Sequence, residues 1–347
     1  MLKGLKSAIK WIVAIVIICV IATFLASING LDVSRDVITV DGSVITEGEY
    51  LFYLENAKST VFSENGIADE TAAKEFLKSG NVDGKPVADY IKEKALEDVT
   101  RNEIAVVKAK EAGISLTEEE RNTARSTEGI KDQIKETYGI STKAYADVME
   151  KAYLIDKYYT HMTTTQPDLF NVTAEDIASA IEENYALVQH VLIMNAKEDG
   201  TTDDDYKAEA KKKAEEVLAK AKAGDNFPAL ITEYGEDPGM ESNPEGYLIT
   251  SNGYTLDGQN QMVESFTKGA FGVSAGEINP ELVESDYGWH IIKRLPITEA
   301  NADYDTMSQN AKNNLTYNKF NTYLDSLKAS AKIEKKDSII NKIKISY

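Results

Sequence analysis

The stretch Glu284–Leu295, ESDYGWHIIKRL, places one of the chain's three histidines inside an apolar segment. His290 follows Trp289 and precedes two isoleucines, a composition typical of a buried strand. A second segment, Leu187–Met194 (LVQHVLIM), repeats this pattern around His190. Because alternate residues of a strand share one face, the two imidazoles can meet if the two segments pair in a sheet.

Two buried imidazoles can satisfy each other, since a neutral ring carries one hydrogen-bond donor and one acceptor. Taken singly, however, each histidine is better explained as a satisfied core residue. No Gly-x-Ser-x-Gly elbow accompanies them, and no His-Glu-x-x-His spacing exists, so neither a serine hydrolase nor a zinc site is indicated.

The segment between these strands predicts an α+β unit of roughly 110 residues. A highly charged helix is expected from about Asp204 to Ala223, ended by Gly224. A long loop rich in Gly, Pro and Asn follows, and then a helical stretch, Met262–Phe271 (MVESFTKGAF).

The segments on either side of this unit are mostly helical in pattern. Asp41-Gly42 predicts a hairpin, and N-caps are expected at Thr46 (with Glu49), Thr117 (with Glu120), Ser141 and Thr173 (with Asp176), with Pro86 opening a long helix that Gly113 stops. Thr163–Pro167 (TTTQP) is expected to be a connection. The apolar stripe from Met307 to Leu327 predicts a C-terminal helix that packs back on the N-terminal helices.

The first thirty residues predict a membrane segment. Three lysines, the last of them Lys10, precede the uncharged run Trp11–Gly30, which is long enough to cross a bilayer as a helix. The lysines should stay in the cytoplasm, so the rest of the chain is expected outside. A cleaved signal peptide is the alternative, but cleavage after Ala26 would require a small residue where Phe24 stands.

Charge and cysteine content exclude several classes of function. The formal net charge of −19 argues against nucleic-acid binding and suits basic or neutral polypeptide clients. The single cysteine, Cys19, lies in the apolar run, so disulfides, a cysteine nucleophile and a cysteine metal site are not expected beyond it.

Five blocks of the sequence, in order and spacing, resemble parvulin-type peptidyl-prolyl isomerases over roughly residues 187 to 296. They are VQHVLIM, AEEVLAKAKAGDNFPALITEYGEDPGM, QMVESFTKGAF, GEINPELVES and DYGWHIIKR. The flanking segments, including VDGSVITEGEY and GISLTEEE, resemble the chaperone domain of the PrsA and SurA foldases.

The resemblance implies an α+β fold: a parvulin-like domain, with a small antiparallel sheet and surrounding helices, inserted in a mostly α-helical SurA-like domain behind one transmembrane helix. The expected boundaries are 1–30 for the membrane segment, 31–185 for the helical domain, 186–297 for the isomerase domain and 298–347 for the returning helix.

The resemblance also implies a set of site residues. His190 and His290 fall at the positions of the paired active-site histidines, and Asp237 at the family's Cys-or-Asp position. The implied substrate-binding residues are Leu248, Gln261, Met262 and Phe266. Glu245-Gly246-Tyr247-Leu248-Ile249 stands where parvulins have Gly-Gly-Asp-Leu-Gly, and the loop to Asn260 is longer than usual.

Plainer explanations of three of these residues stay open at this point. Asp237 can be a turn cap before Pro238-Gly239, and Met262 and Phe266, four residues apart, can be ordinary helix core.

The sequence therefore predicts a membrane-anchored extracytoplasmic isomerase and foldase that acts on X–Pro bonds of unfolded secreted polypeptides, without metal or organic cofactor. The acidic segment after Leu187–Met194 argues against phosphorylated substrates. The alternatives are an inactive parvulin-fold holdase, credible if Tyr247 fills the proline pocket, and a receptor-like surface protein. Whether the chain forms a homodimer is left open.

Overall fold

The computed structural model describes residues 35–197 and 199–345. The predicted membrane segment, residues 1–30, lies outside these ranges. Inside them, no helix has both the length and the apolar character that crossing a membrane requires. Within these ranges the chain divides into two compact units, residues 35–170 with 319–345 (unit 1) and Asn171–Asn318 (unit 2).

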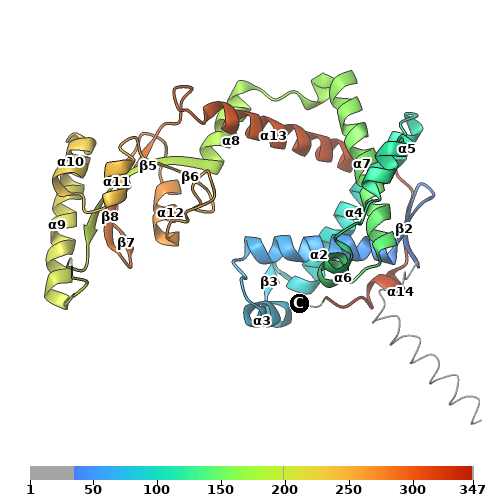
Figure 1. Ribbon diagram of the computed structural model, residues 1–347, viewed down its shortest axis with the longest axis horizontal. Coiled ribbons are helices and arrows are strands. Elements are labelled where there is room, and N and C mark those ends of the chain that lie inside the picture. The colour runs from blue at the N-terminus through green and yellow to red at the C-terminus, as the bar shows by residue number, and fades with distance from the viewer. Residues whose placement is uncertain (1–34, 198, 346–347) are drawn as a thin grey trace, which may run out of the picture. The chain divides into compact units, whose positions relative to one another are not determined.

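Unit 1 is mostly helical (Figure 1). Its elements are β1 (Asp36–Val40), β2 (Ser43–Thr46), α2 (Glu47–Glu64), α3 (Glu70–Ser79), β3 (Asn81–Val82), β4 (Lys85–Pro86), α4 (Val87–Glu111), α5 (Glu118–Ala124), α6 (Lys131–Tyr138), α7 (Thr142–Thr165), the 3₁₀ turn η1 (Pro167–Phe170), β9 (Ile333–Lys335) and α14 (Asp337–Ile340).

The predicted hairpin is confirmed as the β1–β2 pair. Asp41 and Gly42 both take positive φ, 47° and 85°, which a two-residue turn between twisted antiparallel strands requires. Strand β9 pairs with the other edge of β1 and completes a three-stranded sheet. Helices α2, α4 and α7 bury the main core of this unit, which includes Tyr50, Ile91 and Tyr158.

Local signals set most helix starts, as predicted. The Thr46–Glu49, Thr117–Glu120 and Thr173–Asp176 pairs form capping boxes, in which side chains satisfy otherwise unpaired amides at the helix start. The prediction of a connection at Thr163–Pro167 is wrong in part, because α7 continues through Thr165. Thr163, Thr164 and Thr165 donate their hydroxyl hydrogens to carbonyls three or four residues back, so these hydroxyls are satisfied inside the helix.

Unit 2 is built on one antiparallel sheet in the order β6-β5-β8-β7. Its elements are α8 (Ala174–Asn184), β5 (Tyr185–Met194), α9 (Asp204–Lys222), α10 (Phe227–Tyr234), α11 (Pro238–Ser242), β6 (Tyr247–Thr250), α12 (Glu264–Phe271), β7 (Val283–Ser285), β8 (Gly288–Leu295) and α13 (Tyr304–Leu327), the last of which ends in unit 1.

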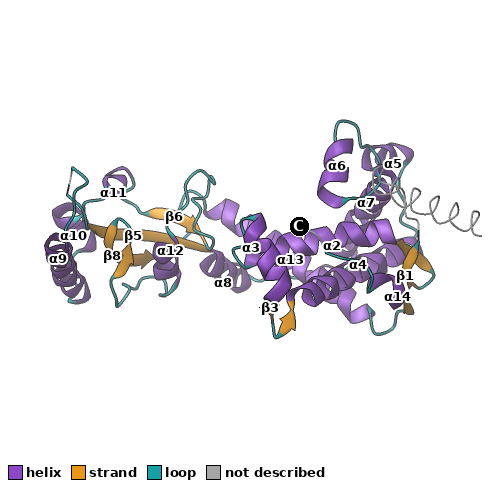
Figure 2. Cartoon of the chain, turned by 90° about the horizontal axis from the view of Figure 1, so that it is seen from below, coloured by secondary structure: helices purple, strands orange, loops and turns teal. Residues whose placement is uncertain are grey.

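The two faces of this sheet are covered by different helices, and Figure 2 shows the strands between α9 and α12. Val191 and Trp289 face α9 and α10. Val188 and Ile292 point to the opposite face of the sheet, where they pack with α12. The period-two alternation of β5 and β8 therefore sends even-numbered side chains, including both strand histidines, to the α12 face.

The loop expected between Gly224 and Met262 contains structure that the sequence did not predict. Helix α10 forms there because Asn226 caps it, Pro228 fits its first turn, and Phe227 with Leu230 is buried against α9. Strand β6 then adds to the sheet edge through pairs such as Val188 with Tyr247.

Candidate active site

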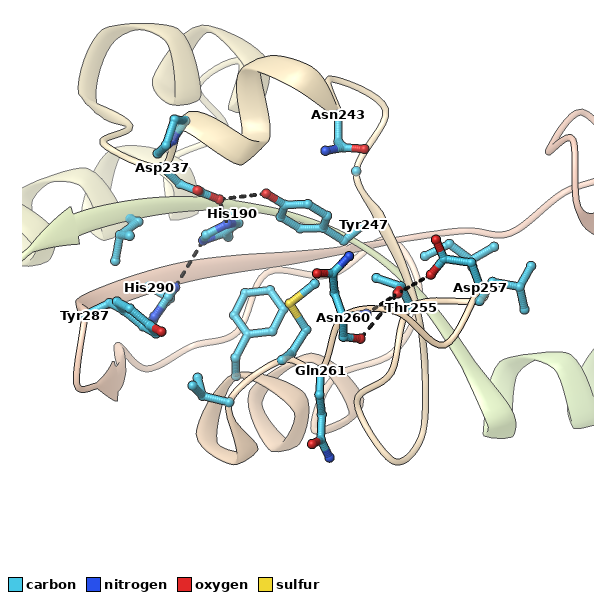
Figure 3. A pocket seen from close by; sticks show the side chains of 18 of the residues that line it. His190, Asp237, Asn243, Tyr247, Thr255, Asp257, Asn260, Gln261, Tyr287 and His290 are labelled. Carbon is cyan, nitrogen blue, oxygen red and sulfur yellow. Dashed lines mark hydrogen bonds and ion pairs between the residues drawn. The ribbon is translucent and has the colours of Figure 1, made fainter.

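The histidine pair lies at the centre of the sheet on the α12 face (Figure 3). In the β5–β8 register His190 lies opposite Ile292, and Leu192 lies opposite His290, so the two imidazoles are diagonal neighbours. Their ring centroids are 5.1 Å apart and their Nδ1 atoms 3.1 Å apart. The exposed fractions are only 3% and 4%. The predicted meeting of the two rings is thus confirmed.

Asp237 anchors one end of this pair. It is the N-cap of α11, and its Oδ1 accepts the amide hydrogen of Gly239 at 2.9 Å. Its Oδ2 lies 2.8 Å from His190 Nε2 and accepts the hydroxyl hydrogen of Tyr247 at 2.9 Å. Asp237 is therefore a turn cap and a partner of His190 at once.

These hydrogen bonds keep the carboxyl of Asp237 ionised. Burial alone would raise its pKa, but hydrogen bonds from His190, the Gly239 amide and Tyr247 outweigh that effect and lower the pKa to about 2. Burial and the bond to Asp237 raise the pKa of Tyr247, so its hydroxyl stays protonated and can donate. An ionised acceptor thus faces His190 at neutral pH.

His290 forms the other end of the network. Its Nε2 lies 2.7 Å from the hydroxyl of Ser285 on β7. Burial is the main cause that lowers its pKa to about 3, and the neighbouring His190 adds to it. His290 is therefore neutral in the ordinary physiological range.

The ionised carboxylate fixes one hydrogen bond of the network, because Asp237 can only accept and His190 must therefore donate its Nε2–H to it. The Nδ1 atoms of the two histidines share the next hydrogen bond, and His290 Nε2 shares one with the hydroxyl of Ser285. All four ring nitrogens are engaged inside the protein.

Aromatic and thioether groups form the apolar side of the site. The ring of Phe266 on α12 stands nearly edge-on to both histidines, with centroids 5.0 Å from His190 and 5.3 Å from His290. Met262 precedes α12, which begins at Glu264, and its amide bonds to the carbonyl of Gly253. The helix-core explanation of the Met262–Phe266 spacing is therefore wrong for Met262.

A pocket of about 980 Å³ opens beside this network. All seven predicted site residues line it: His190, Asp237, Leu248, Gln261, Met262, Phe266 and His290. Leu248 also packs in the cluster of Ile181 and Met307, so it borders the pocket from its margin. Gln261 is exposed and bonds weakly, at 3.4 Å, to the carbonyl of Asn252. A volume near 1,000 Å³ is at the upper end for ligand sites.

Sequence reasoning missed the roles of Tyr247 and Ser285. The sequence raised Tyr247 only under the alternative in which it fills the proline pocket, whereas its hydroxyl points to Asp237 and the pocket stays open beside it (Figure 3). Gly239 permits this, because a Cβ there would lie 2.0 Å from that hydroxyl. Ser285 lies five residues before His290, and the tight turn between β7 and β8 brings the two side chains together. That turn was the only feature from which the role of Ser285 could have been predicted.

Family models match both parts of the chain. Residues 175–297 match the PPIC-type PPIase domain, and residues 1–166 match the SurA-like N-terminal domain. Foldase protein PrsA of Caldanaerobacter subterraneus is 25% identical over 267 residues, which cover 77% of this chain and 75% of that protein. Foldase protein PrsA of Bacillus subtilis is 28% identical over 257 residues, which cover 70% and 79%.

Solved structures of similar proteins include PrsA from Bacillus subtilis and peptidylprolyl isomerase (PrsA) from Bacillus cereus. The first is 23% identical with a TM-score of 0.25, and the match covers 75% of this chain and 88% of that chain. The second is 19% identical with a TM-score of 0.29, and the match covers 91% and 95%.

Proposed function

Because the chain joins a PPIC-type PPIase domain to a SurA-like N-terminal domain and is related to PrsA foldases, we propose that it is an extracytoplasmic peptidyl-prolyl cis–trans isomerase and foldase. Its substrates are X–Pro bonds in unfolded secreted polypeptides. The observation that carries this proposal is the buried network Asp237–His190–His290 beside an open pocket with an apolar wall.

Such a site suits rotation about an amide bond. Turning an X–Pro bond removes amide resonance, with a barrier of about 18–20 kcal/mol, and changes no covalent bond. A pocket that holds the prolyl ring against Met262 and Phe266 and binds the twisted amide better than either planar form lowers that barrier. Catalysis then needs shape and polarity rather than a nucleophile.

The histidines act in this account by holding the pocket, not by exchanging protons with the substrate. Each ring nitrogen already has a protein partner, and the low pKa of His290 keeps its ring uncharged at neutral pH. We assign His190, His290 and Asp237 to the catalytic network, and Met262 and Phe266, with Leu248 and Gln261 at the margin, to substrate binding.

Refolding of a client limited by proline isomerisation tests the proposed activity. The uncatalysed slow phase takes roughly 10–100 s at 25 °C. Substoichiometric wild-type chain should shorten it, whereas His290→Ala should not. His161→Ala is the matched control, since His161 is exposed on α7 of unit 1. A slow phase unchanged by folded wild-type chain would refute the isomerase.

We further propose that residues 1–30 anchor the chain in the cell membrane, with units 1 and 2 outside. Support comes from the lysines before the uncharged run Trp11–Gly30. The chain should stay in the membrane pellet after an alkaline wash, and replacing Val16 and Val20 by Arg should release it. Release of the wild-type chain by the wash would contradict the anchor.

A further inference from the structure

Unit 2 is acidic overall, and much of its basic charge lies away from the histidine pocket. Acidic residues outnumber basic ones more than twofold in residues 171–318. Much of the basic charge lies on α9, which carries Lys207, Lys211, Lys212, Lys213, Lys220 and Lys222. Because α9 packs on the face of Val191 and Trp289, these lysines lie across the sheet from the histidine pocket.

Apart from the two histidines, the pocket is lined by uncharged and acidic side chains among the residues that the structure describes. Three of its lining residues are carboxylates, Asp237, Asp257 and Asp303, and none is lysine or arginine. Both oxygens of Asp237 already have partners, the Gly239 amide at Oδ1 and His190 and Tyr247 at Oδ2. The two remaining carboxylates are therefore the ones that face a bound segment.

The other basic side chains of the β8 and α12 region are already engaged. Lys268 pairs with Glu264 on α12. Lys293 lies 5.6 Å from the ring centre of Phe227. Buried Arg294 donates to the carbonyls of Val273, Glu182 and Tyr185. None of these side chains lines the pocket.

Asp257 is held in place at one end of the pocket. The loop that carries it is folded back by paired bonds between Thr255 and Asn260. Oδ1 of Asp257 accepts from the Thr255 hydroxyl at 2.6 Å and from the Gln259 amide at 3.1 Å. Within residues 35–197 and 199–345, Oδ2 has no partner. Figure 3 shows Asp257 across the pocket from Tyr287.

From this geometry, and resting on the proposed isomerase function, we propose that Asp257 makes the site selective for X–Pro segments that carry lysine or arginine next to the proline. The pocket is large enough for the flanking side chains of a bound proline as well as its ring. A cationic flank finds a fixed carboxylate there and no competing lysine or arginine, whereas an acidic or phosphorylated flank meets like charge. The carboxylate of Asp303 adds to the negative electrostatic potential in the pocket.

The test compares the full-length chain, in a neutral detergent, on three peptides of the form Ala-X-Pro-X-Ala in which X is Lys, Ala or Glu. Exchange NMR gives kcat/KM, and chemical-shift titration gives Kd. For one partly exposed ion pair we expect Lys to exceed Ala by about two- to fivefold and Glu by more. The preference should shrink in 0.5 M NaCl, where the Debye length is roughly 4 Å.

Asp257→Asn keeps the acceptor for Thr255 and the Gln259 amide but removes the charge, so it should bring the Lys peptide close to the Ala peptide. Glu209→Gln, the same charge change on α9, should keep the full preference. Equal kcat/KM and Kd values for all three peptides, or a preference for the Lys peptide that survives Asp257→Asn, would overturn the proposal. If no peptide is isomerised, the isomerase proposal fails, and the Kd values alone decide this one: Lys selectivity supports it, and equal Kd values refute it.

Discussion

His290 gives the fold a pH dependence that can be measured. Its pKa is about 3 in the folded chain, mainly because of burial, and about 6.5 in an unfolded one. Below about pH 6.5 the imidazole of His290 takes up a proton in the unfolded chain but stays neutral in the folded chain until the pH approaches 3. The free energy of unfolding of unit 2 should therefore fall by up to about 1.4 kcal/mol per pH unit as the pH drops from 6.5.

Asp237 contributes only at lower pH. Its lowered pKa gives stability that is present above about pH 4 and is lost as pH falls towards 2. Trp11 and Trp289 are the two tryptophans of the sequence, so fluorescence of a Trp11→Phe chain reports on Trp289 in unit 2. Urea unfolding followed in this way at pH 7 and pH 5 isolates the effect of His290, because Asp237 contributes only at lower pH. His290→Asn should flatten the dependence. An equally steep dependence in that variant would contradict the assignment.

Tyr247 is a positioning residue, because it acts through Asp237. Tyr247→Phe removes one of three donors to that carboxylate, and a hydrogen bond to a charged group contributes roughly 1.5–3 kcal/mol. We expect kcat/KM to fall about three- to tenfold, and the pKa of Asp237, followed by carboxyl ¹³C NMR, to rise from about 2. Tyr254→Phe, on the exposed loop, is the control. An unchanged Asp237 pKa would refute the positioning role.

The histidine pair was predictable from the sequence, while the residues that support it were not. Alternate side chains of a strand point to the same face of a sheet. His190 and His290 could therefore be placed on one face once β5 and β8 were expected to pair. Tyr247 joins the network only because a loop of unusual sequence becomes strand β6 and Gly239 leaves room for the hydroxyl. The contact between Tyr247 and Asp237 depends on tertiary packing that the periodicity of the sequence does not encode.

Helices α2, α4 and α7 share a buried ionic cluster. Lys151 Nζ lies 2.7 Å from Glu49 Oε1 and 2.7 Å from Glu103 Oε2, and Ser43 donates to Glu103. Lys151→Met leaves two buried carboxylates without their cation. Unit 1 should lose about 3–5 kcal/mol of stability, measured as faster hydrogen exchange in α4 and α7.

Lys143→Met is the matched control for that change, since Lys143 pairs with Asp147 on the exposed side of the same helix. An exposed pair of this kind contributes about 0.2–1 kcal/mol. Equal effects of the two substitutions would mean that the buried cluster does not stabilise the helix packing.

Elements with strong local signals were predicted well, and elements that depend on their neighbours were not. Capping boxes and the Asp41-Gly42 turn each satisfy their own backbone, so short windows identify them. Helix α10 and strand β6 each gain their stability from burial against α9 or β5. Their glycine-, proline- and asparagine-rich surroundings predicted loop instead.

The two units have separate cores, so isomerisation and protection of unfolded clients should be separable. Met262→Ala, in unit 2, should lose isomerase activity but still suppress aggregation of a proline-free client, measured by light scattering. Loss of both activities in a folded variant would contradict this separation.

The domain boundaries expected at residues 186 and 297 stay predictions. They differ from the limits of the compact unit at residues 171 and 318, because α8 and the first part of α13 pack with the sheet unit through Ile181 and Met307. The sequence predicted that the whole stripe from Met307 to Leu327 packs back on the N-terminal helices. This is confirmed for Phe320 and Leu324 and wrong for Met307 and Ala311, which pack with Ile181.

Exchange NMR on a short, non-phosphorylated X–Pro peptide tests the central claim most directly. The wild-type chain should accelerate cis–trans exchange, His190→Ala and Met262→Ala should each lose that acceleration, and His161→Ala, outside the pocket, should keep it. That result would place an isomerase site at the histidine pocket. Peptide binding without acceleration by folded wild-type chain, or full activity in both pocket variants, would contradict the account.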